Sequence, residues 1–555
     1  MKLSERSRIA IVLAVFAAVF IALACFSYTR ESATWDEPQH VTAGYAALTR
    51  RDFRIDTEHP PLVRMWAALP LAVSSGIRFD EAGNYWQNGP QWFFCHQFMY
   101  RDNSADWMLY RARFMIVLLG VLLGVLLFCW ARELFGFWPA MATLALYCFE
   151  PNLLAHARLV TTDFGFVCFA FGAVYFLWRL TRRFSIGNVV GLTVFFVLAQ
   201  TTKFTAILLW PIFLALLILL AILTRRFLAT LGVAALLVVA TYAGIWTVYG
   251  FRYRATAATA ERFAFEFEKD ARIQSAAPAL SKATRWITEH RVLPQAYAEG
   301  FLLGQAKAKV RAGYLCGEYS TAGWWYYFPI AFLIKTPLVV IALFFGGLAV
   351  CVRRWRYDRL FAMVPIAVFL GVAMMAHINI GLRHILTIYP FALLLAGAAL
   401  GRWRWARRIA PFVAAVELAL IYPHCLAAFN IIVGGPAHGD EYLVDSNLDW
   451  GQDLKGLKRW MDRRGVSEIN LSYFGTADPA YYGIHCTYLT GGPFYADSQV
   501  SAPQLPGYVA VSLTNLRGVY FNEETRRYYE RLLDRKPVAR IGHSIHVYWI
   551  ERPWW

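Results

Sequence analysis

Charged residues are scarce in this chain. Only 16% of its 555 residues are Asp, Glu, Lys or Arg, whereas 58% are hydrophobic and 16% are aromatic. Soluble domains carry roughly 25% charged residues, so this composition does not fit a soluble protein. The hydrophobic residues form long runs, such as 9–26 and 207–223, each near the roughly 20 residues that cross a bilayer. The sequence therefore predicts a polytopic α-helical membrane protein.

Several catalytic signatures are absent from the sequence. There is no GxxxxGK[ST] phosphate-binding loop, which argues against an ATP-driven pump. No HExxH or Cys-rich zinc pattern occurs, and no GxSxG turn marks a serine nucleophile. The nine cysteines include no CxxC pair. Those in polar segments are candidates for a disulfide whose pairing the sequence does not give, namely Cys95, Cys316 and Cys486.

The net charge of +17 lies mostly in short arginine-rich turns between hydrophobic runs. This distribution is an orientation signal, so we expect no nucleic-acid partner. The arginine-rich turns alternate along the chain, and the positive-inside rule places them, with the N-terminus, in the cytoplasm. The loops 29–110 and 250–323 and the tail then lie outside. We predict about eleven spanning helices, at 8–28, 111–131, 137–151, 160–179, 187–201, 204–223, 228–249, 324–351, 359–376, 384–401 and 409–430.

The sequence divides into a membrane domain, 1–435, and an extracytoplasmic domain, 436–555. The second region alternates helix and strand patterns, which is typical of a small α/β layer fold. The expected helices are 453–464 and 523–534, and the expected strands are 468–474, 508–513, 538–541 and 545–550. Within the outer loop 29–110, the apolar segment 61–74 is too short to cross and is expected to lie on the membrane surface.

Acidic and imidazole side chains gather after the first predicted helix, at Asp36, Glu37, Glu58 and His59. Asp163 opens a later helix on the same predicted side. Carboxylates beside a bilayer are costly, and they can deprotonate a hydroxyl or hold a divalent cation. We therefore expect the chemistry here, although a polar loop or a first-turn helix acid is the structural alternative. Glu58 and His59 either ligate a metal or only hydrogen-bond, so a divalent cation stays open and no other cofactor is indicated.

Basic residues are few near the predicted outer ends of the helices. An intramembrane cation needs an anionic partner, and a lipid phosphate would serve. The candidates are Arg158, Lys203, Lys335, which lies within the predicted helix 324–351, and Arg383. The tail opens with a polar loop that resembles a carbohydrate or cation contact surface, or alternatively a helix cap. Its selected members are Asp445, Asn447, Asp449 and Trp450.

These motifs, in this order, resemble the GT-C superfamily of membrane glycosyltransferases, which use polyprenyl-phosphate sugars. The resemblance is greatest to protein O-mannosyltransferases and to the bacterial aminoarabinose transferases of lipid A. It covers about residues 8–430, with the tail resembling that of bacterial relatives. It rests on Asp36-Glu37 and on segments 58–61, 152–163, 323–328, 379–384 and 445–453. The resemblance implies a GT-C fold in a bacterial inner membrane, with the N-terminus cytoplasmic and the tail periplasmic.

The resemblance also implies an activity. A sugar would pass from a polyprenyl-phosphate carrier to an acceptor hydroxyl on the outer face, in one inverting displacement. Asp36 and Glu37 are the implied catalytic acids, with Asp36 matching the general base. Glu58, His59 and Asp163 would orient the acceptor or bind a cation, and the four basic candidates would stabilise the lipid phosphate. The acceptor, whether protein, lipid or polysaccharide, and the sugar stay open. So do two other functions, a transporter or flippase of lipid-linked sugars and a glycan-binding membrane scaffold.

Overall fold

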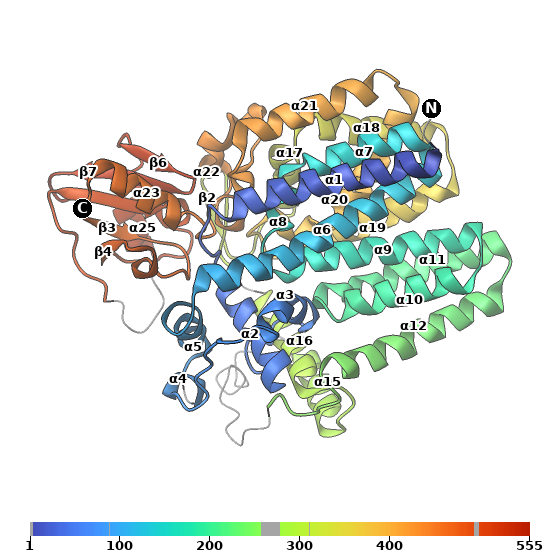
Figure 1. Ribbon diagram of the computed structural model, residues 1–555, viewed down its shortest axis with the longest axis horizontal. Coiled ribbons are helices and arrows are strands. Elements are labelled where there is room, and N and C mark those ends of the chain that lie inside the picture. The colour runs from blue at the N-terminus through green and yellow to red at the C-terminus, as the bar shows by residue number, and fades with distance from the viewer. Residues whose placement is uncertain (1–3, 88, 257–277, 310, 493–498, 555) are drawn as a thin grey trace.

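A bundle of long helices forms most of the molecule, and a small sheet domain lies at one end of it (Figure 1). The computed structural model describes residues 4–87, 89–256, 278–309, 311–492 and 499–554. Within these ranges, six helices are long and apolar enough to cross a membrane: α1 (Glu5–Tyr28), α6 (Ala105–Phe135), α9 (Thr162–Arg182), Phe204–Thr224 including α11, α12 (Phe227–Val248), and Tyr357–Met375 including α19. The predicted multi-pass helical architecture is confirmed.

The predicted number of spanning helices is not confirmed. A seventh span is reached only by joining the bent pair α17 (Tyr327–Lys335) and α18 (Leu338–Arg353). Three further predicted spans are apolar helices of 12 to 15 residues: α7 (Phe137–Cys148), α10 (Ile186–Gln200) and α20 (Ile388–Arg402). The last predicted span corresponds to α21 (Ala406–Ile421), which has 16 residues. These helices are shorter than the roughly 20 residues of a full crossing.

The predicted helix 324–351 is divided at Thr336 and Pro337. The two halves, α17 and α18, are bent by 118°. Pro337 has no backbone N–H and disfavours helical geometry in the residue before it. Thr336 accordingly adopts an extended conformation, with φ −87° and ψ 138°. Lys335 therefore ends a short helix, whereas the sequence placed it inside a continuous one.

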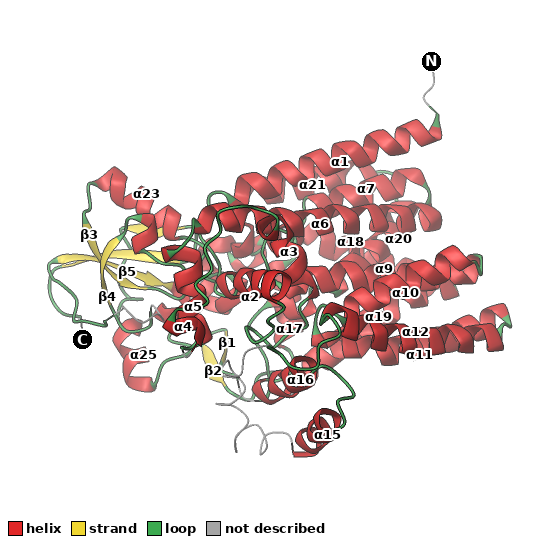
Figure 2. Cartoon of the chain, turned by 60° about the horizontal axis from the view of Figure 1, so that its bottom comes forward, coloured by secondary structure: helices red, strands yellow, loops and turns green. Residues whose placement is uncertain are grey.

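The arginine-rich turns lie at one end of the bundle, and the loops that were predicted to lie outside, which we call the outer loops, are at the other end (Figure 1). The turns at 225–226, 353–359 and 402–408 share the end that carries the N-terminus, and the sheet domain lies at the other end (Figure 1). The first outer loop forms α2 (Glu37–Arg50), α3 (Leu62–Ala72), α4 (Asn84–Gln87) and α5 (Gln91–His96). Helix α3 matches the predicted short surface helix, and Figure 2 shows α2 and α3 at the end of the bundle nearest the sheet domain.

The second large outer loop, 250–323, is described only in part, since 257–277 and 310 lie outside the described residues. Its described part contains α15 (Pro278–Glu289), α16 (Gln295–Lys307) and the hairpin of β1 (Gly313–Leu315) and β2 (Glu318–Ser320). The sequence patterns do not predict this hairpin. Its strands are only three residues long, which is too short for a clear alternating pattern.

The tail folds as a five-stranded sheet with helices, which confirms the predicted α/β domain. The strand order is β4-β3-β5-β7-β6. Strand β3 runs parallel to β4 and β5, whereas β7 runs antiparallel to β5 and β6. The strands are β3 (Glu468–Ser472), β4 (His485–Tyr488), β5 (Gly507–Ser512), β6 (Ala539–Ile541) and β7 (Ile545–Ile550), and the helices include α23 (Leu454–Arg464), α24 (Leu513–Leu516) and α25 (Glu523–Glu530). Only β4, a partly exposed edge strand, lacks a counterpart among the predicted strands.

Candidate active site

Three segments far apart in the chain meet at Asp36. Asp36 directly precedes α2, and its side chain is 26% exposed. Arg383, in the short helix Leu382–Ile385, places Nη1 2.9 Å from Asp36 Oδ2 and 3.6 Å from Asp163 Oδ2. One guanidinium therefore holds two carboxylates that belong to different helices.

Asp163 has a second cationic partner. It lies in the first turn of α9, as its sequence position predicts, and is 3% exposed. Its Oδ1 accepts a hydrogen bond from Lys203, while its Oδ2 faces Arg383. A first-turn helix acid needs neither contact, so Asp163 belongs to a charged cluster of two acids and two bases. We call Asp36, Asp163, Lys203 and Arg383 the four-charge cluster.

Glu37 lies beside the cluster but is completely buried. Its Oε1 accepts bonds from Arg113 Nε (2.8 Å) and Val160 N (2.9 Å), and its Oε2 accepts bonds from Arg113 Nη2 (2.5 Å) and from Thr34 N (2.8 Å) and Oγ1 (3.0 Å). Burial alone would raise the pKa of Glu37, but Arg113 and these donors hold it below its ordinary value. The carboxylate is thus a buried anchor between α6 and the turn that leads to Asp163.

Glu58 and His59 lie later in the same outer loop, after helix α2. Glu58 pairs with Lys307 of α16 at 2.8 Å, and both side chains are partly exposed. His59 is buried enough that its pKa falls to about 3, so its imidazole is neutral at physiological pH. Among the described residues, no group of three or more His, Cys, Asp or Glu side chains is arranged to hold a metal ion.

Asp56, which lies in the same acidic segment but is not among the predicted site residues, is the buried acid of this segment. Its Oδ2 lies 2.7 Å from both His40 Nδ1 and Arg64 Nη1. Burial would raise the pKa of Asp56, but Arg64 and His40 hold it well below its usual range. These contacts fix the chain just before Glu58 and His59.

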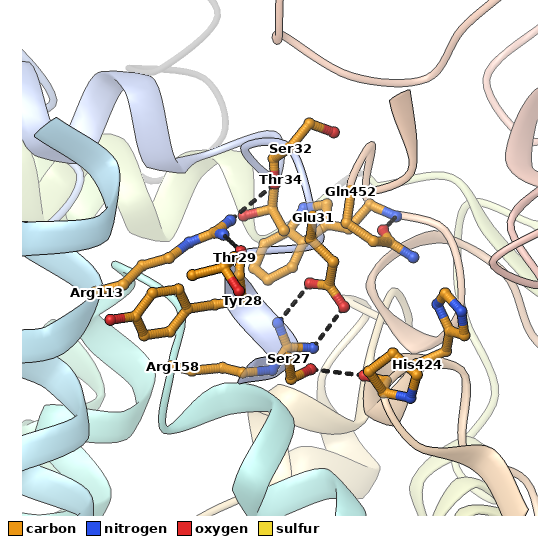
Figure 3. Close-up of polar contacts among 12 residues, drawn as sticks. Ser27, Tyr28, Thr29, Glu31, Ser32, Thr34, Arg113, Arg158, His424 and Gln452 are labelled. Carbon is orange, nitrogen blue, oxygen red and sulfur yellow. Dashed lines mark hydrogen bonds and ion pairs between the residues drawn. The ribbon is translucent and has the colours of Figure 1, made fainter. Parts of the chain in front are cut away.

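Two of the four predicted phosphate-binding cations are engaged in other contacts. Arg158 forms a two-point ion pair with Glu31, in which both side chains are buried (Figure 3). Lys335 donates to the carbonyl oxygens of Leu426 (3.1 Å), Ala428 (2.9 Å) and Asn447 (2.5 Å). Within the described chain, neither cation contacts Asp36 or Asp163. The structure therefore brings only Lys203 and Arg383 into the cluster.

The polar loop of the tail is buried against this site. Asn447 accepts a bond from Leu382 N (2.9 Å) and donates one to Tyr327 Oη (2.9 Å), which ties the tail to two outer segments. Asp449 accepts a bond from Thr514 N (2.8 Å), and burial raises its pKa to about 8. Asp445 is 4% exposed, and its carboxylate accepts a bond from Tyr520.

Trp450 is the member of this loop that reaches the cluster. It is 2% exposed, and its ring centre lies 4.3 Å from the guanidinium carbon of Arg383. The loop was selected from the sequence as a contact surface for ligands. In the structure its selected residues instead contact other parts of the protein.

Several buried polar atoms around the cluster have no hydrogen-bond partner in the described chain. They are His59 Nδ1, Arg383 Nε and His384 Nε2. Buried polar groups are normally paired. Unpaired ones beside a charged cluster are expected where a substrate or water supplies the missing partner, so this region suits a polar ligand.

Arg113 and Glu31 are important residues that the sequence patterns do not single out. Arg113 donates to Glu37 and also to the carbonyl oxygens of Tyr28 (2.9 Å) and Ser32 (2.8 Å) (Figure 3). A signal was present for Arg113, because an arginine inside a predicted spanning segment requires an anionic partner. No local signal marks Glu31, whose partner lies 127 residues away.

Residues 106–246 match the family model described as dolichyl-phosphate-mannose-protein mannosyltransferase. The matched segment is about a quarter of the chain and contains Arg113, Arg158, Asp163 and Lys203. No curated protein matches the sequence significantly.

Solved structures similar to the chain include ArnT from Cupriavidus metallidurans, in the apo state (14% identity, 98% of both chains, TM-score 0.32) and bound to undecaprenyl phosphate (13% identity, 98% of both chains, TM-score 0.33). Another is the oligosaccharyltransferase of Archaeoglobus fulgidus in complex with Zn and sulfate (14% identity, 94% of this chain and 70% of that chain, TM-score 0.43). The family match confirms the predicted resemblance and indicates that the chain is a glycosyltransferase.

Proposed function

We propose that this membrane protein transfers a sugar from a polyprenyl-phosphate carrier to an acceptor hydroxyl, with Asp36 as the general base. The observation that carries the proposal is the four-charge cluster, in which a partly exposed Asp36 lies 2.9 Å from Arg383. The matched family is named for a dolichyl-phosphate sugar, which is a donor of this chemical class.

Asp36 is the acid best placed to act as the base. A general base must reach the proton that it removes, and Asp36 is 26% exposed, whereas Glu37 and Asp163 are 0% and 3% exposed. Arg383 contacts Oδ2 of Asp36, and Oδ1 has no hydrogen-bond partner in the described chain. Oδ1 is therefore the atom proposed to face the acceptor hydroxyl. Glu37 supports it from the next position in the chain.

Arg383 and Lys203 are proposed to receive the lipid phosphate. In the cluster each cation is paired with a carboxylate, Arg383 with Asp36 and Asp163, and Lys203 with Asp163. A phosphate that enters competes with the carboxylates for these cations and weakens the ion pair between Arg383 and Asp36. Positive groups placed where charge develops contribute on the order of 3 kcal/mol each in a dry site.

The reaction is one displacement. The acceptor oxygen attacks the anomeric carbon, its proton passes to Asp36, and the bond between that carbon and the phosphate oxygen breaks. The lipid phosphate leaves with one additional negative charge, held by Arg383 and Lys203. Attack opposite the leaving group inverts the anomeric configuration.

The proposed site works on the outer face of the membrane. It lies at the end of the bundle opposite the arginine-rich turns (Figure 1), which the positive-inside rule places in the cytoplasm. Glu58 and His59 are proposed to orient the acceptor, and a divalent cation held by them stays a prediction.

The test uses the purified full-length protein in liposomes with a radiolabelled polyprenyl-phosphate hexose and a crude cell-envelope acceptor. Asp36→Asn is expected to lower transfer by about 10²- to 10⁴-fold, the usual contribution of a general base. Asp80→Asn is the matched control, because Asp80 is an exposed acid of the same outer loop outside the cluster. Equal transfer by Asp36→Asn and Asp80→Asn contradicts the role of Asp36. Movement of the lipid-linked sugar across the bilayer without transfer favours a flippase.

A further inference from the structure

The tail is bonded directly to the loop that carries Asp36. Ser32 N donates to Gln452 O (2.8 Å), and Trp35 N donates to Trp450 O (2.9 Å). On the other side of the loop, Thr476 Oγ1 donates to Trp35 O (2.6 Å). The residue directly before Asp36 is therefore held by the tail through both its N–H and its carbonyl group.

Gly451 allows the tail to turn at this point. Its φ is +90°, a backbone conformation that residues with a side chain rarely adopt. A Cβ there would lie 2.8 Å from Tyr473 Oη and 2.9 Å from Gly475 Cα. Tyr473 also donates a hydrogen bond to Gly451 O (2.5 Å). The turn presents Trp450 to the membrane domain, where its side chain is fully buried.

The face of Trp450 lies against Arg383, whose guanidinium carbon is 4.3 Å from the ring centre. This is the geometry of a cation–π contact. The same guanidinium makes its other described contacts with Asp36 and Asp163, and its Nε has no hydrogen-bond partner in the described chain. The guanidinium is therefore held by two carboxylates at Nη1 and by the face of the Trp450 ring.

We propose that Trp450 is a positioning residue of the active site, which holds Arg383 against Asp36. One short tail segment thus fixes both members of the pair: its backbone holds the loop of the base, and its indole holds the arginine. This inference rests on the proposed function of Asp36 and Arg383, and it makes the tail a structural part of the catalytic site. A purely structural Trp450 would instead stabilise the tail without affecting turnover specifically.

The kinetic test compares three variants of the full-length protein in liposomes. Trp450→Leu keeps apolar bulk but removes the aromatic face, Trp450→Phe restores an aromatic face, and Trp460→Leu is the matched control. Trp460, in α23, is 7% exposed and packs on Tyr508, with ring centres 5.2 Å apart. Trp450→Leu is expected to lower kcat by about 2- to 30-fold, the range of a cation–π contact, with little change in the KM for the acceptor. Trp450→Phe should recover most of kcat, and Trp460→Leu should leave it near wild type.

A double-mutant cycle measured by thermal unfolding tests the contact between Trp450 and Arg383 without an activity assay. It measures the Tm of Trp450→Leu, Arg383→Gln and the double variant. Residues in contact are non-additive, so the double variant should lose less than the sum of the single losses. Where Trp450→Leu does not fold, Trp450→Met, which also lacks an aromatic face, replaces it in the same cycle.

The outcomes separate this inference from the proposed function. Additive losses of Tm overturn it, and so does an equal loss of kcat in Trp450→Leu and Trp460→Leu. A non-additive cycle in a protein that transfers no sugar refutes the proposed function and, with it, the catalytic role of Trp450, while the contact between Trp450 and Arg383 stands.

Discussion

The buried pair of Glu37 and Arg113 gives the sharpest stability prediction. Both side chains are completely buried, and Glu37 accepts bonds from Arg113, Thr34 and Val160. Glu37→Gln keeps the shape but removes the negative charge, so Arg113 is left as an uncompensated buried cation. Breaking a buried ion pair from one side costs about 3–5 kcal/mol. We expect a loss of that size, because Arg113 then keeps only neutral hydrogen-bond acceptors, such as the carbonyl oxygens of Tyr28 and Ser32.

The assay is denaturation of the purified protein in detergent, followed by intrinsic tryptophan fluorescence. Glu523→Gln is the control, since Glu523 forms an exposed ion pair with Arg527, a kind of pair worth only about 0–1 kcal/mol. Glu37→Gln should also lower turnover, because Glu37 links the residue after Asp36 to the turn before Asp163. A Glu37→Gln protein as stable and as active as Glu523→Gln would refute this reasoning.

Further predictions concern Arg158, the two cations of the four-charge cluster, and Asp449. Arg158→Gln should destabilise the protein by about 3–5 kcal/mol in the same denaturation assay, because Arg158 pairs with buried Glu31. The variant should leave the Kd for polyprenyl phosphate within about threefold of wild type. A larger change in Kd would indicate that Arg158 binds the lipid phosphate after all. Lys203→Gln and Arg383→Gln should each weaken polyprenyl phosphate binding to liposome-embedded protein by about tenfold, equivalent to about 1.4 kcal/mol, and unchanged binding in both would remove them from that role. Asp449, with its pKa raised to about 8, is more stable protonated, so its contribution to stability is complete below its unfolded pKa of about 4 and is lost as pH rises through about 8. The Tm of wild type should therefore fall more between pH 6 and pH 9 than that of Asp449→Asn, and parallel curves would contradict the assignment.

Sequence patterns predicted local structure well where periodicity was strong. The tail helix α23 and strands β3, β5, β6 and β7 lie within a few residues of their predicted positions, because each combines a clear hydrophobic pattern with turn residues at its ends. The break between α17 and α18 was missed although Pro337 signals it, since the hydrophobic run continues on both sides. A hydropathy pattern alone does not distinguish a bent pair from one long helix.

The site was predicted less completely, because ion pairs join residues distant in sequence. Asp36 and Arg383 are 347 positions apart, and both were selected separately, but their pairing has no local signature. Arg158 and Lys203 looked equivalent as cations near the outer face. Only the fold distinguishes them, since Arg158 faces Glu31 and Lys203 faces Asp163. Residue type and helix position therefore indicated candidates, while the packing decided their partners.

The bonds between the first outer loop and the tail also determine when the site can exist during synthesis. Ser32 meets Gly451 across 419 positions, and Trp35 meets Thr476 across 441. A ribosome therefore releases Asp36 long before it makes the segment that holds it, and every spanning helix after α1 is made in between. A nascent chain cannot complete this geometry until residues 450–476 have been made and have docked on the loop that carries Asp36. The order of translation thus delays formation of the candidate site until this part of the tail has been made.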